Sequence, residues 1–160
     1  MQPLRSTTPH PHPRLDMAQA APAALHAFVA ADAAIRKSPL DVRVRELVKI
    51  RASQLNGCAF CVDMHVREAR KLGESEERLH QLVVWRESLL FSATERAALA
   101  YAEAATLLRE GGVSEPVWDA ARDAFDVESL GALVAMVALI NAWNRIAVPL
   151  RTPPGTPTGT

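Results

Sequence analysis

The sequence predicts an all-α fold, and three observations carry that prediction. Alanine and other strong helix formers recur along the chain, with apolar residues spaced three and four positions apart as in an amphipathic helix. Capping residues and glycines stand where such helices would begin and end. Runs that alternate β-branched with polar residues are missing, and the one apolar run that resembles a strand, residues 81–85, continues a capped helical pattern.

The prolines indicate where a single helical domain begins and ends. The chain has 160 residues, enough for one domain with one core. Of its 11 prolines, four lie in the first 14 residues and four in the last 12. Proline-rich segments without a hydrophobic pattern tend to remain extended. We therefore expect a helical domain over residues 15–148, with disordered tails over residues 1–14 and 149–160.

The first three helices follow from alanine content, caps and breakers. An alanine-rich segment predicts a helix over residues 17–36. The Ser-Pro pair at 38–39 opens the second helix, because serine is a good N-cap and proline is favoured at the first helical position. That helix ends near the Asn-Gly pair at 56–57, and a third covers residues 58–72 and stops at Gly73.

Each of the remaining four helices opens on a capping residue. The run Ser-Ala-Thr-Glu at residues 92–95 has the pattern of a capping box. The last helix is apolar on nearly every side, so it should lie at the centre of the fold or at a subunit contact. Its Asn141, Asn144 and Arg145 either line a site or fix the helix to a neighbouring subunit, and we favour the second interpretation. The caps are Ser75, Ser92, Ser114 and Asp126, and the helices behind them end near residues 85, 110, 125 and 146.

The distribution of charge and apolar residues argues against two classes of partner. The chain has 18 Lys and Arg residues against 18 Asp and Glu residues, whereas a nucleic-acid binder would carry a basic excess. The longest stretch without a charged residue is residues 129–144, which is shorter than the ~20 residues of a membrane span. No apolar run of a secretory signal stands at the start. We expect a cytoplasmic protein without nucleic-acid or membrane partners.

The expected helix over residues 58–72 carries two cysteines and a histidine on one face. Cys58, Cys61 and His65 are three and four positions apart, so their side chains share the apolar side of the helix. Cys58 lies at the helix start, where unpaired N–H groups and the helix dipole favour a thiolate. A thiolate is the form of cysteine that attacks peroxides and disulfides. The spacing therefore favours thiol chemistry, with His65 within reach of Cys61 directly or through a water.

Glu46 is the candidate partner of that histidine. If the turn at residues 56–57 folds the two helices antiparallel, Glu46 returns alongside His65 and completes a carboxylate–imidazole–thiol relay. The neighbouring basic residues share no single helical face, and we expect them to be solvated. They are Arg43, Arg45, Lys49 and Arg51.

Other interpretations of these residues remain open. A Cys-x-x-Cys pair in a reducing compartment can be redox-active, metal-bound or an inert part of the core. The chain could therefore be a non-catalytic redox sensor or interaction protein, whose disulfide reshapes a surface. A metal-binding module is a weaker alternative, because a zinc ribbon brings a second ligand pair that this sequence lacks. That module would use Cys58, Cys61, His65 and Glu46.

These residues and their spacing resemble the AhpD-like alkylhydroperoxidases of the carboxymuconolactone decarboxylase superfamily, in the branch that contains a Cys-x-x-Cys pair. The resemblance rests on Glu46 twelve positions before Cys58, on the cysteine pair itself, and on His65 four positions after Cys61. It covers about residues 17–148. Asn56-Gly57, Trp85-Arg86 and the segment 139–145 add to it.

The resemblance implies an all-helical subunit that assembles into trimers or hexamers, and a thiol peroxidase or disulfide-reductase activity. We expect a thiol peroxidase that uses no metal or organic cofactor. Its implied partners are a hydroperoxide substrate and a dithiol electron donor. Cys61 would attack the peroxide, Cys58 would resolve it as a disulfide, and Glu46 with His65 would relay the proton. One departure is Phe60, which stands where well-studied members have a second histidine. The cysteine pair argues against lactone decarboxylation, because the decarboxylase branch lacks it.

Overall fold

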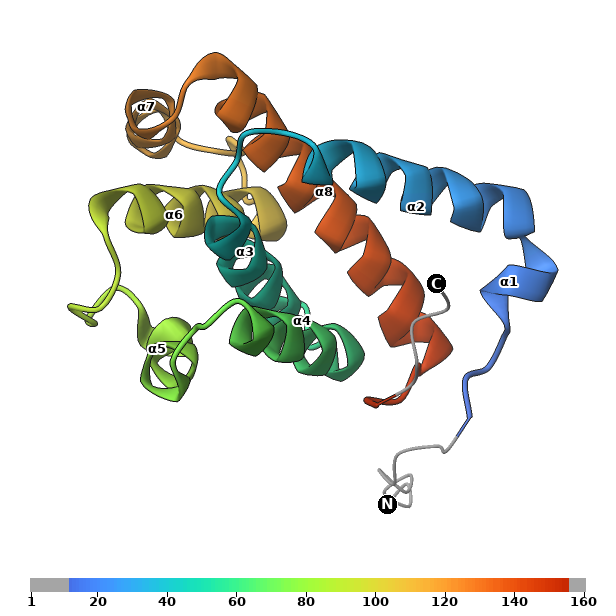
Figure 1. Ribbon diagram of the computed structural model, residues 1–160. Helices are drawn as coiled ribbons and strands as arrows, with labels where there is room; N and C mark the ends of the chain where they lie inside the picture. Colours follow the sequence, from blue (N-terminus) through green and yellow to red (C-terminus); the bar gives the residue numbers. More distant parts are fainter. Residues whose placement is uncertain (1–11, 156–160) are drawn as a thin grey trace, which may run out of the picture.

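The computed structural model describes residues 12–155, and within that range all regular structure is helical (Figure 1). The predicted all-α fold is confirmed. Helices α3 (Val42–Leu55), α6 (Ala93–Leu107) and α8 (Val127–Leu150) form the centre of the bundle. The elements are α1 (Met17–Ala20), α2 (Pro22–Arg36), α3 (Val42–Leu55), α4 (Ala59–Lys71), α5 (Glu76–Gln81), η1 (Leu82–Val84), α6 (Ala93–Leu107), α7 (Glu115–Ala124) and α8 (Val127–Leu150).

The predicted first helix is two helices, broken at Ala21. Pro22 has no N–H to donate and disfavours helical backbone at the residue before it. Ala21 accordingly has φ −147° and ψ 58°, outside the helical region. Proline then occupies the first position of α2, where its missing N–H costs nothing.

The predicted start of the second helix is wrong by three residues. The helix begins at Val42, and the carboxylate of Asp41 caps it by accepting hydrogen bonds from two backbone N–H groups of its first turn. Ser38, the predicted cap, instead donates its hydroxyl to the carbonyl of Ile35 at 2.6 Å and closes the end of α2. A carboxylate is the stronger cap because it also interacts favourably with the helix dipole.

Most of the later caps are as predicted. Ser75, Ser92 and Asp126 each accept a backbone N–H at the start of their helices, and Ser92 forms the predicted capping box. Ser114 precedes α7 but makes no side-chain capping bond. The last helix continues to Leu150, past its predicted end.

Two apolar clusters fill the bundle on either side of α3. One lies among α3, α6, α7 and α8 and includes Val48 and Leu133. The other lies among α3, α4, α5 and α6 and includes Ile50, Leu82 and Leu99. All five side chains are fully buried, so α3 is held rigidly from both sides.

α8 is the one described helix that is long and apolar enough to cross a membrane by length and composition. The sequence analysis did not identify this helix as long enough, because it measured only the stretch without charged residues. The helix extends beyond that stretch and includes Glu128 and Arg145. Ten of its residues are buried against other helices, which is the pattern of a core helix in a bundle. α2 packs on it, with the rings of Phe28 and Trp143 5.3 Å apart.

Both ends of the described chain are held against the bundle. The backbone N–H of Arg14 donates to the carbonyl of Leu150 at 2.8 Å. The backbone N–H of Gly155 donates to the carboxylate of Asp63 on α4 at 2.9 Å. Residues 1–11 and 156–160 of the predicted tails lie outside the described residues.

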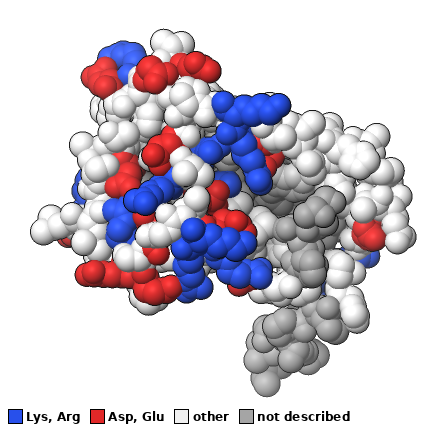
Figure 2. Space-filling view, in the orientation of Figure 1, with Lys and Arg blue, Asp and Glu red and all other residues white. Residues whose placement is uncertain are grey.

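Charged side chains are intermixed on the face seen in Figure 2, whereas the part formed by α2 and α8 is largely uncharged. The alanine-rich helix α2 contributes no buried residue, so one of its sides is left without a neighbour in the described chain.

We expect Ser92→Ala to lower the free energy of unfolding by about 1 kcal/mol, because it removes one hydrogen bond of the capping box. Urea denaturation followed by circular dichroism measures the change. Thr94→Ala, at an exposed position of the same turn, is the control and should have little effect. An equal loss in both variants would contradict a specific role for the cap.

Candidate active site

The turn between α3 and α4 brings the predicted carboxylate and imidazole together. Gly57 lies in this turn with φ +66°, a conformation that glycine adopts without strain. α4 then packs along α3, and Nδ1 of His65 lies 3.0 Å from Oε2 of Glu46. Both side chains are buried. The helical spacing and the turn are thus sufficient to place this pair.

Lys49 is a third buried member of this group, although we expected it to be solvated. Its Nζ lies 2.5 Å from Oε1 of Glu46, and only 5% of the residue is exposed. Burial raises the pKa of the Glu46 carboxyl, but the hydrogen bond with His65 and the charge of Lys49 together hold that pKa below its usual value. Glu46 is therefore a carboxylate at neutral pH.

His65 is a neutral imidazole at neutral pH. Burial lowers the pKa of His65, the hydrogen bond to Glu46 raises it, and the charge of Lys49 lowers it further, so that the net shift is downward. Because Glu46 is ionised, Nδ1–H of the ring donates to it, and Nε2 keeps its lone pair. A neutral ring in this tautomer can accept a proton at Nε2.

The two cysteines form a hydrogen-bonded pair at the start of α4. Cys58 is the N-cap of the helix, and its Sγ accepts the backbone N–H of Cys61 at 3.4 Å. The thiol of Cys61 also donates to Cys58, which is the largest influence lowering the pKa of Cys58, to about 7, against the opposing effect of burial. The same bond and burial raise the pKa of Cys61. Above about pH 7 the pair therefore carries one negative charge, which rests on Cys58.

Asn144 and Ser53 complete the surroundings of the sulfurs. The side chain of Asn144 is fully buried, and its amide forms hydrogen bonds with both cysteines that lower their pKa values. Its Nδ2 donates to Oγ of Ser53 at 3.0 Å, and the Ser53 hydroxyl in turn bonds Cys61. α8 thus supplies a donor to the thiolate from the opposite side to α4.

The sequence argument missed Ser53, and for the asparagines of α8 it favoured a subunit contact over a place in the site. Inside the chain, Nδ2 of Asn56 donates to Oδ1 of both Asn141 and Asn144 at 2.8 Å, and Asn141 also donates to Thr106 at 3.0 Å. The sequence did contain a signal for this network, since two asparagines stand in an otherwise apolar helix. Buried amides need hydrogen-bond partners, so such residues indicate polar contacts inside the fold. For Asn144 the interpretation that it lines the site holds.

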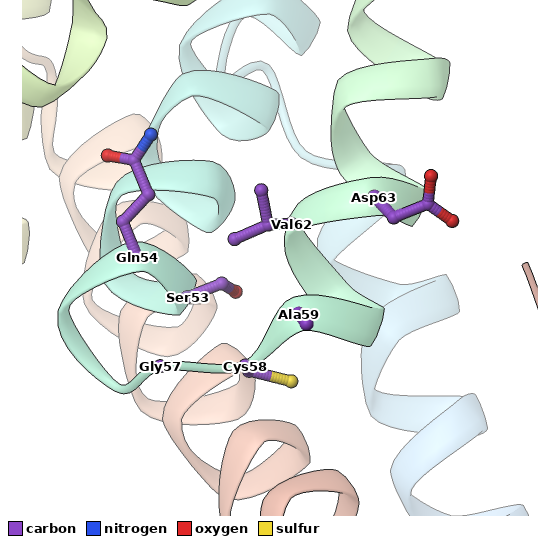
Figure 3. Close-up of a pocket in the computed structure, with 7 residues that line it drawn as sticks. All are labelled: Ser53, Gln54, Gly57, Cys58, Ala59, Val62 and Asp63. Carbon is purple, nitrogen blue, oxygen red and sulfur yellow. The ribbon is translucent and has the colours of Figure 1, made fainter. Parts of the chain in front are cut away.

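A shallow hollow gives access to Cys58 (Figure 3). Ser53 and Gln54 project from the end of α3, and Val62 faces them from α4. Cys58, which is 2% exposed, is one of its lining residues and Cys61 is not, so the hollow lies next to Cys58 rather than Cys61. The lining residues are Ser53, Gln54, Gly57, Cys58, Ala59, Val62 and Asp63.

The structure also bears on two further expectations, the contact of His65 with Cys61 and the environment of Phe60. Among the residues that the structure describes, no hydrogen bond joins His65 to either sulfur, so the relay from His65 to Cys61 stays a prediction. Phe60 packs against the apolar cluster of the two cysteines and Ala147.

The metal-binding alternative finds no support between residues 12 and 155. No group of three or more His, Cys, Asp or Glu side chains in that range is placed to hold a metal ion. Glu46 and His65 are bound to each other and Glu46 also to Lys49, so these donors are already engaged.

Comparison with known proteins identifies relatives of this chain. The model of the Carboxymuconolactone decarboxylase family matches residues 22–104. The uncharacterized protein YdfG of Bacillus subtilis (strain 168) is 42% identical over 113 residues, which are 71% of this chain and 77% of YdfG.

Two solved structures share the arrangement of helices. One is a protein of unknown function from Agrobacterium tumefaciens, for which a role as the antioxidant defence protein AhpD has been suggested. It is 39% identical with a TM-score of 0.85, and the match covers 92% of this chain and 99% of that one. The other, an uncharacterized peroxidase-related protein with an alkylhydroperoxidase AhpD core from Ralstonia eutropha JMP134, is 23% identical with a TM-score of 0.75. That match covers 88% of this chain and 75% of the other, and supports the fold alone.

We expect iodoacetamide to alkylate Cys58 with a rate that rises with pH, is half-maximal near pH 7 and then reaches a plateau, because only the thiolate reacts. Mass spectrometry of the digested protein identifies the labelled cysteine. Cys58→Ser is the control, in which the labelling at residue 58 with a midpoint near pH 7 should be lost. A half-maximal rate near pH 8.5 at Cys58, as for a free cysteine, would contradict the assignment.

We expect Asn144→Leu to move that midpoint upward by about one pH unit, because it removes a hydrogen-bond donor to the thiolate while keeping a similar volume. The same alkylation profile measures it. Thr106→Val changes the asparagine network at a residue that contacts Asn141 and should leave the midpoint in place. A midpoint unchanged in Asn144→Leu would show that this amide does not stabilise the charge.

Proposed function

Because this chain belongs to the carboxymuconolactone decarboxylase family and has the AhpD-like helical fold, we propose that it is a thiol-dependent peroxidase that works through its cysteine pair. The observation that carries the proposal is the buried thiol–thiolate pair of Cys58 and Cys61, with the pKa of Cys58 lowered to about 7. A thiolate beside a second thiol is what reduction of a peroxide followed by disulfide formation requires. The role in antioxidant defence suggested for the Agrobacterium tumefaciens protein supports the same activity.

The proposed cycle moves two electrons from the dithiol to the peroxide. A cysteine thiolate attacks the terminal oxygen of the hydroperoxide, the O–O bond breaks, and the departing alkoxide takes a proton to leave as alcohol or water. The cysteine becomes a sulfenic acid, and the other cysteine attacks its sulfur, expelling water and forming a disulfide. An external dithiol then reduces the disulfide by exchange through a mixed disulfide.

We assign the attack on the peroxide to Cys61, as the resemblance implies. The hydrogen bond between the sulfurs favours the thiolate on Cys58, so attack by Cys61 first requires transfer of its thiol proton to Cys58. Position in the hollow supports Cys58 as the sulfur that the dithiol donor attacks. We assign to His65, oriented by Glu46, the exchange of protons with the sulfurs and the departing oxygen.

The partners are a hydroperoxide and a dithiol donor, and we propose that the subunits form a homo-oligomer, a trimer or hexamer. The unburied, alanine-rich helix α2 and the uncharged part of the surface over α2 and α8 support such assembly (Figure 2). The cytoplasm is the proposed location, because it keeps a cysteine pair reducible between turnovers.

One observation favours a second candidate, a redox sensor that is oxidised once and does not turn over. Phe60 is apolar and packs on the cysteine cluster, so it contributes no hydrogen bond to a bound peroxide. Turnover separates the two functions, because a sensor consumes one equivalent of peroxide and then stops.

The test follows consumption of hydrogen peroxide and of an alkyl hydroperoxide with dithiothreitol as the donor. We expect many turnovers in the wild type and a fall to the background rate of the reagents in both Cys61→Ser and Cys58→Ser, since each lacks one half of the disulfide. Ala59→Ser adds a hydroxyl to the hollow without touching the pair and should keep the activity.

Wild-type turnover in Cys61→Ser would remove that residue from the mechanism. Consumption of a single equivalent by the wild type would contradict the peroxidase and support the sensor.

A further inference from the structure

Lys49 is a buried cation that the proposed cycle does not use. It lies on α3, is 5% exposed, and its Nζ is 2.5 Å from Oε1 of Glu46. Burying a charge is costly unless a counter-charge offsets the loss of water. Glu46 is that counter-charge, and its other oxygen binds His65. The carboxylate therefore stands between a lysine and a histidine, with one oxygen for each.

The presence of the lysine changes which form of the histidine is stable. A buried imidazole beside a carboxylate alone is favoured as an imidazolium, because the two opposite charges then neutralise each other. With Lys49 in place the carboxylate is already neutralised, and protonation of His65 would put two cations against one anion. Repulsion from Lys49 and burial both favour the neutral ring.

Other charged groups around the ring do not replace this effect. From α2, Asp32 favours the imidazolium, but it is paired with Arg36 at 2.6 Å. α8, the other helix that packs on α4, carries only Glu128, in its first turn, and Arg145, whose guanidinium is bound to Asn141. Lys49 is thus the cation that contacts the carboxylate of the pair.

We propose that Lys49 is a positioning residue: by binding Oε1 of Glu46 it keeps His65 neutral, with Nδ1–H directed to the carboxylate and Nε2 free to accept a proton. This proposal rests on the proposed function, in which His65 exchanges protons with the cysteine site. In this proposal Lys49 extends to lower pH the range over which His65 exchanges protons. A histidine that is already protonated cannot accept the proton of a thiol.

The experiment is a titration of His65 by NMR in the full chain, with its ring signal assigned by its loss in His65→Gln. We expect the wild-type ring to titrate below the ordinary histidine value of about 6.5. In Lys49→Met the titration should move upward by about one pH unit or more. Lys49→Arg, which keeps the charge, should stay near the wild type, and Lys71→Met, at an exposed lysine of α4, should not change it.

Turnover of peroxide provides the second readout. The acid limb of its pH profile should move upward in Lys49→Met by the same amount as the titration, while the rate on the alkaline side changes little. A merely structural lysine would lower the rate at every pH.

An unchanged or lowered titration of His65 in Lys49→Met would overturn the proposal. If that variant does not fold, Lys49→Gln is titrated in its place, and a wild-type value at or above 6.5 is by itself contrary to the proposal. Failure of the peroxidase assignment would appear separately, as a wild type without turnover, while the NMR titration still decides the role of Lys49.

Discussion

The packing of α4 against α3 is the constraint on which the cysteine site depends. The chain reverses at Gly57 directly after α3, so Cys58 becomes the residue that caps α4 and its sulfur receives a backbone N–H of the new helix. The same packing sets the imidazole of His65 against the carboxylate of Glu46. One helix pair thus fixes both the charged sulfur and the candidate base, and a shift of α4 along α3 would disturb both together.

α8 contributes a second set of hydrogen bonds to the surroundings of the sulfurs. A helix so apolar would serve as a core element alone, but Asn144 places an amide beside the cysteines and joins Ser53 and Asn56 in one buried network. Each amide in that network has partners, and among the described residues no buried side-chain oxygen or nitrogen is left without one. A satisfied network of this kind holds its groups in one arrangement, which keeps a donor aimed at the thiolate.

Helical periodicity was enough to predict what lies on one face or one turn apart. It placed His65 with the cysteines, and the Asn-Gly turn returned Glu46 to it. The start of α3 at Asp41 was missed because two cap signals lie three residues apart and local sequence does not choose between them. Lys49 and Asn144 were assigned to solvent and to a subunit contact for a different reason: their burial arises from contacts between helices, which single-helix patterns do not report.

The hydrogen bond from Gly155 to Asp63 fixes where the carboxyl-terminal segment leaves the bundle. Asp63 also lines the hollow over Cys58, so this hydrogen bond sets the last described residue beside that hollow. A purification tag joined directly to Gly155 would therefore lie at the edge of the opening and obstruct the approach of substrates.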